Sequence, residues 1–113
     1  MKHLITFLFI VMYASSFAQS PLNVMTFNIR LNTASDSMNA WPFRRDHAAS
    51  QILFYEVHLL GVQEALHDQM MDLQQRLTSY QSFGGGRDDG KTKGEYSAIF
   101  YDTARLQWLN GNM

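Results

Sequence analysis

The chain has 113 residues, which is enough for one small domain. Apolar residues make up 46% of it, so a packed core is expected and general disorder is excluded. A formal net charge of −1 gives no sign of a nucleic-acid or membrane surface, and the absence of cysteine excludes disulfides, thiolate metal sites and cysteine catalysis.

Residues 1–18 have the layout of a secretory signal peptide. Lys2 precedes an apolar run over residues 4–13, and the small residues Ser16 and Ala18 precede a cut before Gln19. A membrane anchor is the alternative, but a spanning helix needs about 20 apolar residues and this run is shorter. We therefore expect cleavage near Ala18–Gln19, a secreted or periplasmic product over residues 19–113, and no stable membrane anchor.

The first half of this product reads as strand, helix, strand. Residues 22–30 are rich in apolar, β-branched and aromatic residues, which predicts a buried strand over residues 23–28. Pro42 suits the first turn of a helix over residues 43–57. The run at residues 59–63 predicts a second buried strand. The apolar face of the helix is predicted to carry Ala49, Ile52, Leu53 and Val57.

The second half continues with a helix over residues 66–77, whose apolar positions recur at helical spacing. An extended run at 80–83 then enters a charged, glycine-rich loop. Residues 96–102 predict a strong strand, and 105–109 a partner strand after a short turn. The alternation of strands and helices predicts an α/β fold with a mixed sheet.

Two polar residues stand at the ends of the apolar strands: Asn28 is the last residue of the first, and Glu64 comes directly after the second. Ligands in open α/β sheets bind beyond the carboxyl ends of the strands, and parallel neighbours would bring both residues to one rim. Glu64 suits Mg2+, which takes one or two protein carboxylates and completes its shell with water and phosphate. Asn28 offers an uncharged donor and acceptor for a phosphate or a nucleophile.

Each of these residues also has a structural interpretation. Glu64 precedes a helix, where a carboxylate favours the helix dipole. Asn28 is a common turn former. Arg87, behind three glycines, is a candidate phosphate-binding cation because glycines let backbone N–H groups approach an anion, but a mobile surface loop is the alternative. The histidines show no metal-ligand spacing, and nothing in the sequence indicates an oligomer.

Three segments in order, "VMTFNIR", "GVQEAL" and "GRDDGKTKGEYSAIFY", resemble the endonuclease/exonuclease/phosphatase family. The segment "NAWPFRRD" and the third of these resemble a secreted bacterial subgroup of it. The resemblance implies a four-layered α/β sandwich with mixed sheets and hydrolysis of phosphate esters dependent on Mg2+, with Mn2+ as a possible substitute. It implies that Glu64 binds the metal, that Asn28 lies by the metal and the scissile phosphate, and that Arg87 contacts phosphate. It leaves open whether the substrate is a nucleic acid, an inositol phosphate or a phospholipid head group.

The sequence departs from the family in its second half. The expected histidine, the Asp-x-Asn motif and the closing Asp-His pair are absent, and "NGN" at 110–112 reads as a turn. The chain therefore resembles the N-terminal half of such an enzyme, with an incomplete sandwich, and we expect marginal stability and little or no activity alone. A non-catalytic secreted binding module is the alternative. A glycosidase is disfavoured because no second carboxylate is placed opposite Glu64.

Overall fold

The structure is a computed structural model that describes residues 20–112, so the expected signal peptide lies outside the described residues. None of the helices in the described part of the chain has the length and apolarity that a bilayer crossing requires. The elements in chain order are β1 (Val24–Asn28), η1 (Ala34–Asn39), α2 (Trp41–Phe54), β2 (Leu59–Ala65), α3 (His67–Arg76), β3 (Tyr80–Phe83) and β4 (Tyr96–Asp102).

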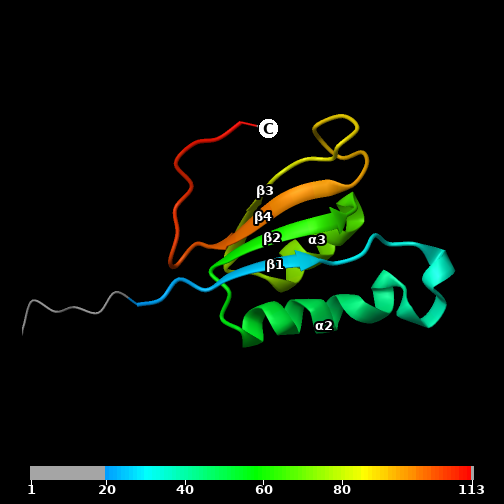
Figure 1. The fold of residues 1–113 in the computed structure, drawn as a ribbon, viewed down its shortest axis with the longest axis horizontal. Helices are drawn as coiled ribbons and strands as arrows, with labels where there is room; N and C mark the ends of the chain where they lie inside the picture. Colours follow the sequence, from blue (N-terminus) through cyan, green and yellow to red (C-terminus); the bar gives the residue numbers. More distant parts are fainter. Residues whose placement is uncertain (1–19, 113) are drawn as a thin grey trace, which may run out of the picture.

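The strands form one mixed sheet in the order β1-β2-β4-β3 (Figure 1). β1 and β2 are parallel and are joined through α2, whereas β4 is antiparallel to both β2 and β3. The predicted α/β fold with a mixed sheet is therefore confirmed. The parallel pair is the part that positions the site, because it brings the carboxyl ends of β1 and β2 to one edge.

The core lies between the two helices and one face of the sheet. Alternate residues of the central strands point to this face, among them Leu60 of β2 and Phe100 of β4, which are both fully buried. Ile52 of α2 and Leu73 of α3 meet them there. Trp41 closes the N-terminal end of α2, and its indole N–H donates to Asp72 of α3 at 2.9 Å.

The opposite face of the sheet has no helix on it among the described residues. Val24 on this face is 64% exposed. Trp108 from the segment after β4 covers part of it, because its ring stacks on Phe83 with centroids 4.2 Å apart and lies 6.4 Å from the ring of Tyr101. The candidate site lies on this same face.

The predicted helix over residues 43–57 begins at Trp41 and ends earlier, at Phe54. Glu56 has φ = 48°, a left-handed conformation that ends the helical path and turns the chain toward β2. Leu53 is 48% exposed, so its predicted place on the apolar face is wrong. Val57 is buried, but it lies in the connection rather than in the helix.

The predicted strand at 105–109 is also wrong. β4 already pairs with β2 on one side and β3 on the other, so it has no free edge for another strand. The chain turns instead after β4, where the N–H groups of Arg105 and Leu106 both donate to the carbonyl of Asp102. Besides β2, the strand that pairs with β4 is the extended run at Tyr80–Phe83.

Candidate functional site

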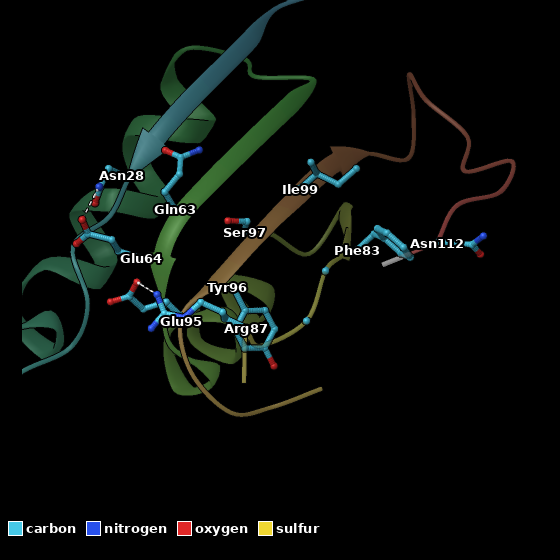
Figure 2. Close-up of a pocket in the computed structure, with 12 residues that line it drawn as sticks. Asn28, Gln63, Glu64, Phe83, Arg87, Glu95, Tyr96, Ser97, Ile99 and Asn112 are labelled. Carbon is cyan, nitrogen blue, oxygen red and sulfur yellow. Dashed lines mark hydrogen bonds and ion pairs between the residues drawn. The ribbon is translucent and has the colours of Figure 1, made fainter. Parts of the chain in front are cut away.

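Asn28 and Glu64 meet at the edge formed by the ends of β1 and β2. The parallel register pairs Asn28 with Gln63, which sets Glu64 one residue beyond the pair. The Asn28 side-chain amide donates from Nδ2 to Glu64 Oε1 at 2.7 Å (Figure 2). Two residues that are 36 positions apart in sequence thus form a direct polar pair.

A β-bulge releases the Glu64 side chain from the core. Leu60 and Val62 point to the helices, so simple alternation would send residue 64 to the same face. The register with β4 shifts between Gln63 and Ala65, and Ala65 takes the buried position instead. Glu64 is the extra residue of this bulge, and it leaves the pleat toward Asn28.

The backbone of Glu64 is strained. Its φ is 62°, a left-handed conformation that costs a residue with a side chain about 1–2 kcal/mol. A strained residue of this kind persists only where its surroundings determine it, and such residues gather at functional sites. A carboxylate that served only to favour the helix dipole would not need a strained bulge to hold it at the end of β2.

The amide of Asn28 is oriented from its other side. The backbone N–H of Arg30 donates to Asn28 Oδ1 at 2.9 Å, which turns Nδ2 toward the carboxylate. Asn28 therefore contributes both to the turn after β1 and to the polar pair. Among the described residues no hydrogen bond reaches the second carboxylate oxygen of Glu64.

Arg87 lies on a loop that closes on itself. The N–H of Gly86 donates to the carbonyl of Lys91, and the N–H of Arg87 donates to the carbonyl of Glu95. A Cβ on Gly86 would lie 2.1 Å from the carbonyl oxygen of Lys93, so only glycine fits at this crossing. The loop is hydrogen-bonded across its width and presents Arg87 on the same face as Glu64.

The side chain of Arg87 is 70% exposed, and its guanidinium lies between two carboxylates. It lies 3.6 Å from Asp88 and 3.6 Å from Glu95, and Figure 2 shows the second of these pairs. Exposed ion pairs contribute at most about 1 kcal/mol, so a phosphate could displace them.

These three predicted residues line one pocket of about 670 Å³ on the open face of the sheet. Sequence reasoning missed its other polar residues: Gln63, Glu95, Tyr96, Ser97 and Asn112. Tyr96 and Ser97 could not be assigned to the pocket from local patterns, because their position depends on how the strands are ordered in the sheet. β4 runs antiparallel to β2, so its first residues lie beside the last residues of β2.

Charged groups around the pocket are held by defined partners. A side-chain hydrogen bond from Arg30 lowers the pKa of Asp36, and the same pairing raises the pKa of Arg30. In the glycine-rich loop, hydrogen bonds from the backbone N–H groups of Lys93 and Lys91 lower the pKa of Asp89. Burial raises the pKa of Tyr96, with a contribution from the charge of Asp89.

The oxygen donors of the described residues could supply part of the coordination shell of a hard cation, but not all of it. Within residues 20–112 no three His, Asp or Glu side chains come together to hold a metal. Glu64 offers one carboxylate with an oxygen directed away from Asn28. Mg2+ commonly binds through one or two carboxylates and takes its other oxygens from water and phosphate, so Glu64 fits this use.

No family model and no curated protein matches the chain. Solved structures do match. An endonuclease/exonuclease/phosphatase from Bacteroides vulgatus has 46% identity and a TM-score of 0.69 over 70% of this chain and 30% of its own. A mannosyl-6-phosphatase from Bacteroides thetaiotaomicron has 38% identity and a TM-score of 0.72 over 74% of this chain and 32% of its own.

A second protein from Bacteroides thetaiotaomicron, described as an endonuclease/exonuclease/phosphatase family protein, has 39% identity and a TM-score of 0.71. It is matched over 74% of this chain and 30% of its own, so the chain spans about a third of the length of these structures. The family resemblance of the three sequence segments is confirmed, and the four-stranded sheet with its two helices is part of that family's fold.

Proposed function

With the partial fold of the endonuclease/exonuclease/phosphatase family as the premise, we propose that this chain carries the metal-binding edge of a phosphoesterase that depends on Mg2+, with Mn2+ as a possible substitute. The observation that carries the proposal is the Asn28–Glu64 pair at the carboxyl ends of parallel strands, held by a strained bulge. Phosphatases among the similar proteins support a phosphate-ester substrate.

Glu64 would bind the metal through the carboxylate oxygen that Asn28 does not contact. Asn28 would fix the orientation of that carboxylate and offer an amide to the substrate phosphate. A bound Mg2+ would supply Lewis-acid polarisation of a phosphoryl oxygen and stabilise negative charge at the leaving group.

Arg87 would attract the phosphate group. Its guanidinium lies on the same pocket as Glu64, and its partners Asp88 and Glu95 leave it mostly exposed. Bidentate contact with phosphate suits a guanidinium better than an ammonium group. We propose that phosphate replaces one of the two carboxylates when substrate binds.

We further propose secretion, with residues 1–18 as the cleaved signal peptide. The support is the sequence pattern of a basic residue, an apolar run and small residues before the cut. We also propose that this chain has little activity alone. The described residues supply one metal-binding carboxylate, and the chain spans about a third of the similar structures.

The experiment that tests the metal assignment is calorimetric titration of the chain with Mg2+ and with Mn2+. We expect saturable binding that Glu64→Gln weakens at least tenfold, because a neutral amide replaces the carboxylate while its shape is kept. Binding that Glu64→Gln leaves unchanged would refute the assignment. Metal-independent binding of a ligand at the pocket would favour a binding module instead.

Glu56→Gln is the matched control for this titration. Glu56 is also a glutamate with positive φ, but it is more exposed than Glu64 and lies in the connection that leads into the first residues of β2. Loss of its charge changes the net charge of the chain by the same amount as Glu64→Gln. Equal weakening by both variants would show that the effect is a general electrostatic one.

A further inference from the structure

A buried glutamine, Gln69, lies behind the candidate site. It is the third residue of α3, and its side chain has no exposed surface. Burial of an amide without partners would cost several kcal/mol. Its hydrogen-bond partners therefore indicate which backbone segments the side chain stabilises.

The Gln69 side chain makes three hydrogen bonds, all to backbone groups. Its Oε1 accepts from the N–H of Asn32 at 2.8 Å and from the N–H of Leu66 at 3.0 Å. Its Nε2 donates to the carbonyl of Arg30 at 2.9 Å. The bond to Leu66 is one half of a capping box, in which the third helical residue reaches back to the residue before the helix. The other two bonds leave the helix altogether.

These anchor points lie directly after the two site residues. Arg30 and Asn32 are two and four residues beyond Asn28, and Leu66 is two residues beyond Glu64. One side chain thus ties the segment leaving β1 to the segment leaving β2. Any change in the separation of these segments would have to break a buried hydrogen bond.

The segments that Gln69 holds contain strained residues. Arg30 has φ = 56° and Glu64 has φ = 62°. Strain at such positions is retained only where other contacts determine the backbone. Arg44 of α2 supports the first segment from its other side, with a hydrogen bond to the carbonyl of Ile29 at 2.8 Å. Gln69 contacts both segments, and its neighbour Asp68 adds a bond to the first by accepting from the side-chain amide of Asn32 at 2.6 Å.

We propose that Gln69 is a positioning residue that fixes Asn28 and Glu64 relative to each other by holding the segments after β1 and β2. It does not line the pocket, and it acts through the backbone of Arg30, Asn32 and Leu66. Its effect on metal binding rests on the proposed function. Its effect on the Asn28–Glu64 hydrogen bond does not, so the two parts can fail separately.

The test compares Gln69→Leu with Gln74→Leu in this chain. Gln74 is on the same helix and also bonds to backbone, donating to the carbonyl of Tyr80 at 2.7 Å, but that contact lies at β3. The first measurement is the NMR signal pair of the Asn28 side-chain amide, which reports its bond to Glu64 without any metal. We expect Gln69→Leu to move these signals toward those of a free amide and Gln74→Leu to leave them in place.

The second measurement is Mg2+ affinity by calorimetry. Loss of a supporting contact behind a metal ligand typically weakens binding about 10–100-fold, so we expect a tenfold or greater loss for Gln69→Leu and less than threefold for Gln74→Leu. If the unaltered chain binds no Mg2+, the proposed function fails while the amide signals still decide the role of Gln69.

Gln69→Met provides a second variant in case Gln69→Leu does not fold. Its unbranched, uncharged side chain follows the path of glutamine and fills the buried site, but it can make none of the three hydrogen bonds to Arg30, Asn32 and Leu66. We expect altered Asn28 amide signals in this variant too. Unchanged Asn28 signals in either folded variant, or the same change in Gln74→Leu, would overturn the proposal.

Discussion

The left-handed backbone of Glu64 allows the effect of backbone strain on stability to be measured separately from the loss of the carboxylate. Replacing Glu64 with glycine or with alanine removes the carboxylate and its hydrogen bond to Asn28 in both cases. The two variants differ in the backbone alone. Glycine adopts φ = 62° without steric cost, whereas alanine retains the clash of its Cβ with the carbonyl oxygen.

The size of the difference follows from two opposing terms. Relief of the left-handed conformation contributes about 1–2 kcal/mol in favour of glycine. The greater conformational entropy of glycine in the unfolded chain opposes this and lowers the stability of the glycine variant by about 0.4–1 kcal/mol. We therefore expect the free energy of unfolding of Glu64→Gly to exceed that of Glu64→Ala by about 1 kcal/mol. Since both variants lose the same hydrogen bond, its uncertain value cancels.

Urea unfolding followed by far-ultraviolet circular dichroism measures this difference. The same pair of substitutions at Glu56, with φ = 48°, should also favour glycine, by the same reasoning. At Met71, an exposed position in the middle of α3, alanine should be more stable than glycine by about 1 kcal/mol. If Glu64→Gly is no more stable than Glu64→Ala while Met71 behaves as expected, strain at the bulge is refuted.

Three further outcomes test the packing and the glycine-rich loop. Leu73→Ala, at a fully buried position between α3 and the sheet, should lower the free energy of unfolding by about 2–5 kcal/mol in urea titration. Trp108→Ala removes the stacking on β3 and should cost about 0.5–1.5 kcal/mol in the same assay. The lowered pKa of Asp89 means that its bonds to Lys91 and Lys93 persist above its unfolded pKa and are lost as the pH falls through its folded pKa; the NMR amide signals of both lysines should report that loss.

Each of these outcomes has its own control. Leu53→Ala, half-exposed on α2, should cost much less than Leu73→Ala, and an equal cost would contradict the assigned core. Leu109→Ala, at an 85% exposed position, should leave stability unchanged, so a loss matching that of Trp108→Ala would argue against stacking. Asp89→Ala should abolish the acid transition of the lysine amides. An unaltered transition in this variant would assign it to another group.

The parallel pair of β1 and β2 could be predicted because its signals are local. Both strands are short apolar runs, and a helix between consecutive strands favours a parallel crossover. Asn28 and Glu64 follow from the same reasoning, since parallel strands end at one edge. The extended run at 80–83 carried a weaker signal, and its place beside β4 depends on which edges of the sheet remain open.

The errors have a common physical origin in long-range geometry. Residues 105–109 have strand-like composition, but β4 has no free edge to pair with them. Leu53 has the right helical spacing, but α2 meets the sheet through Ala48, Ala49 and Ile52, which turns Leu53 outward. In both cases local pattern sets what a segment can form, and the neighbouring elements decide what it does form.

The bulge at Glu64 shows most clearly why part of the site is hidden in the sequence. A strand read with period two places residue 64 with Leu60 and Val62, against the helices, where an ionised carboxylate without a partner would be strongly disfavoured. Two solutions exist: the strand can end before residue 64, or an extra residue can shift the alternation. The sequence pattern favours the first, since Leu66 begins a new helical period. The structure takes the second, and Ala65 fills the core while Glu64 reaches Asn28. The small side chain of Ala65 makes this possible, because a larger residue there would have to displace the helices. The sequence therefore predicts which carboxylate lies at the ends of the parallel strands, and the packing around Ala65 and Gln69 determines where it points.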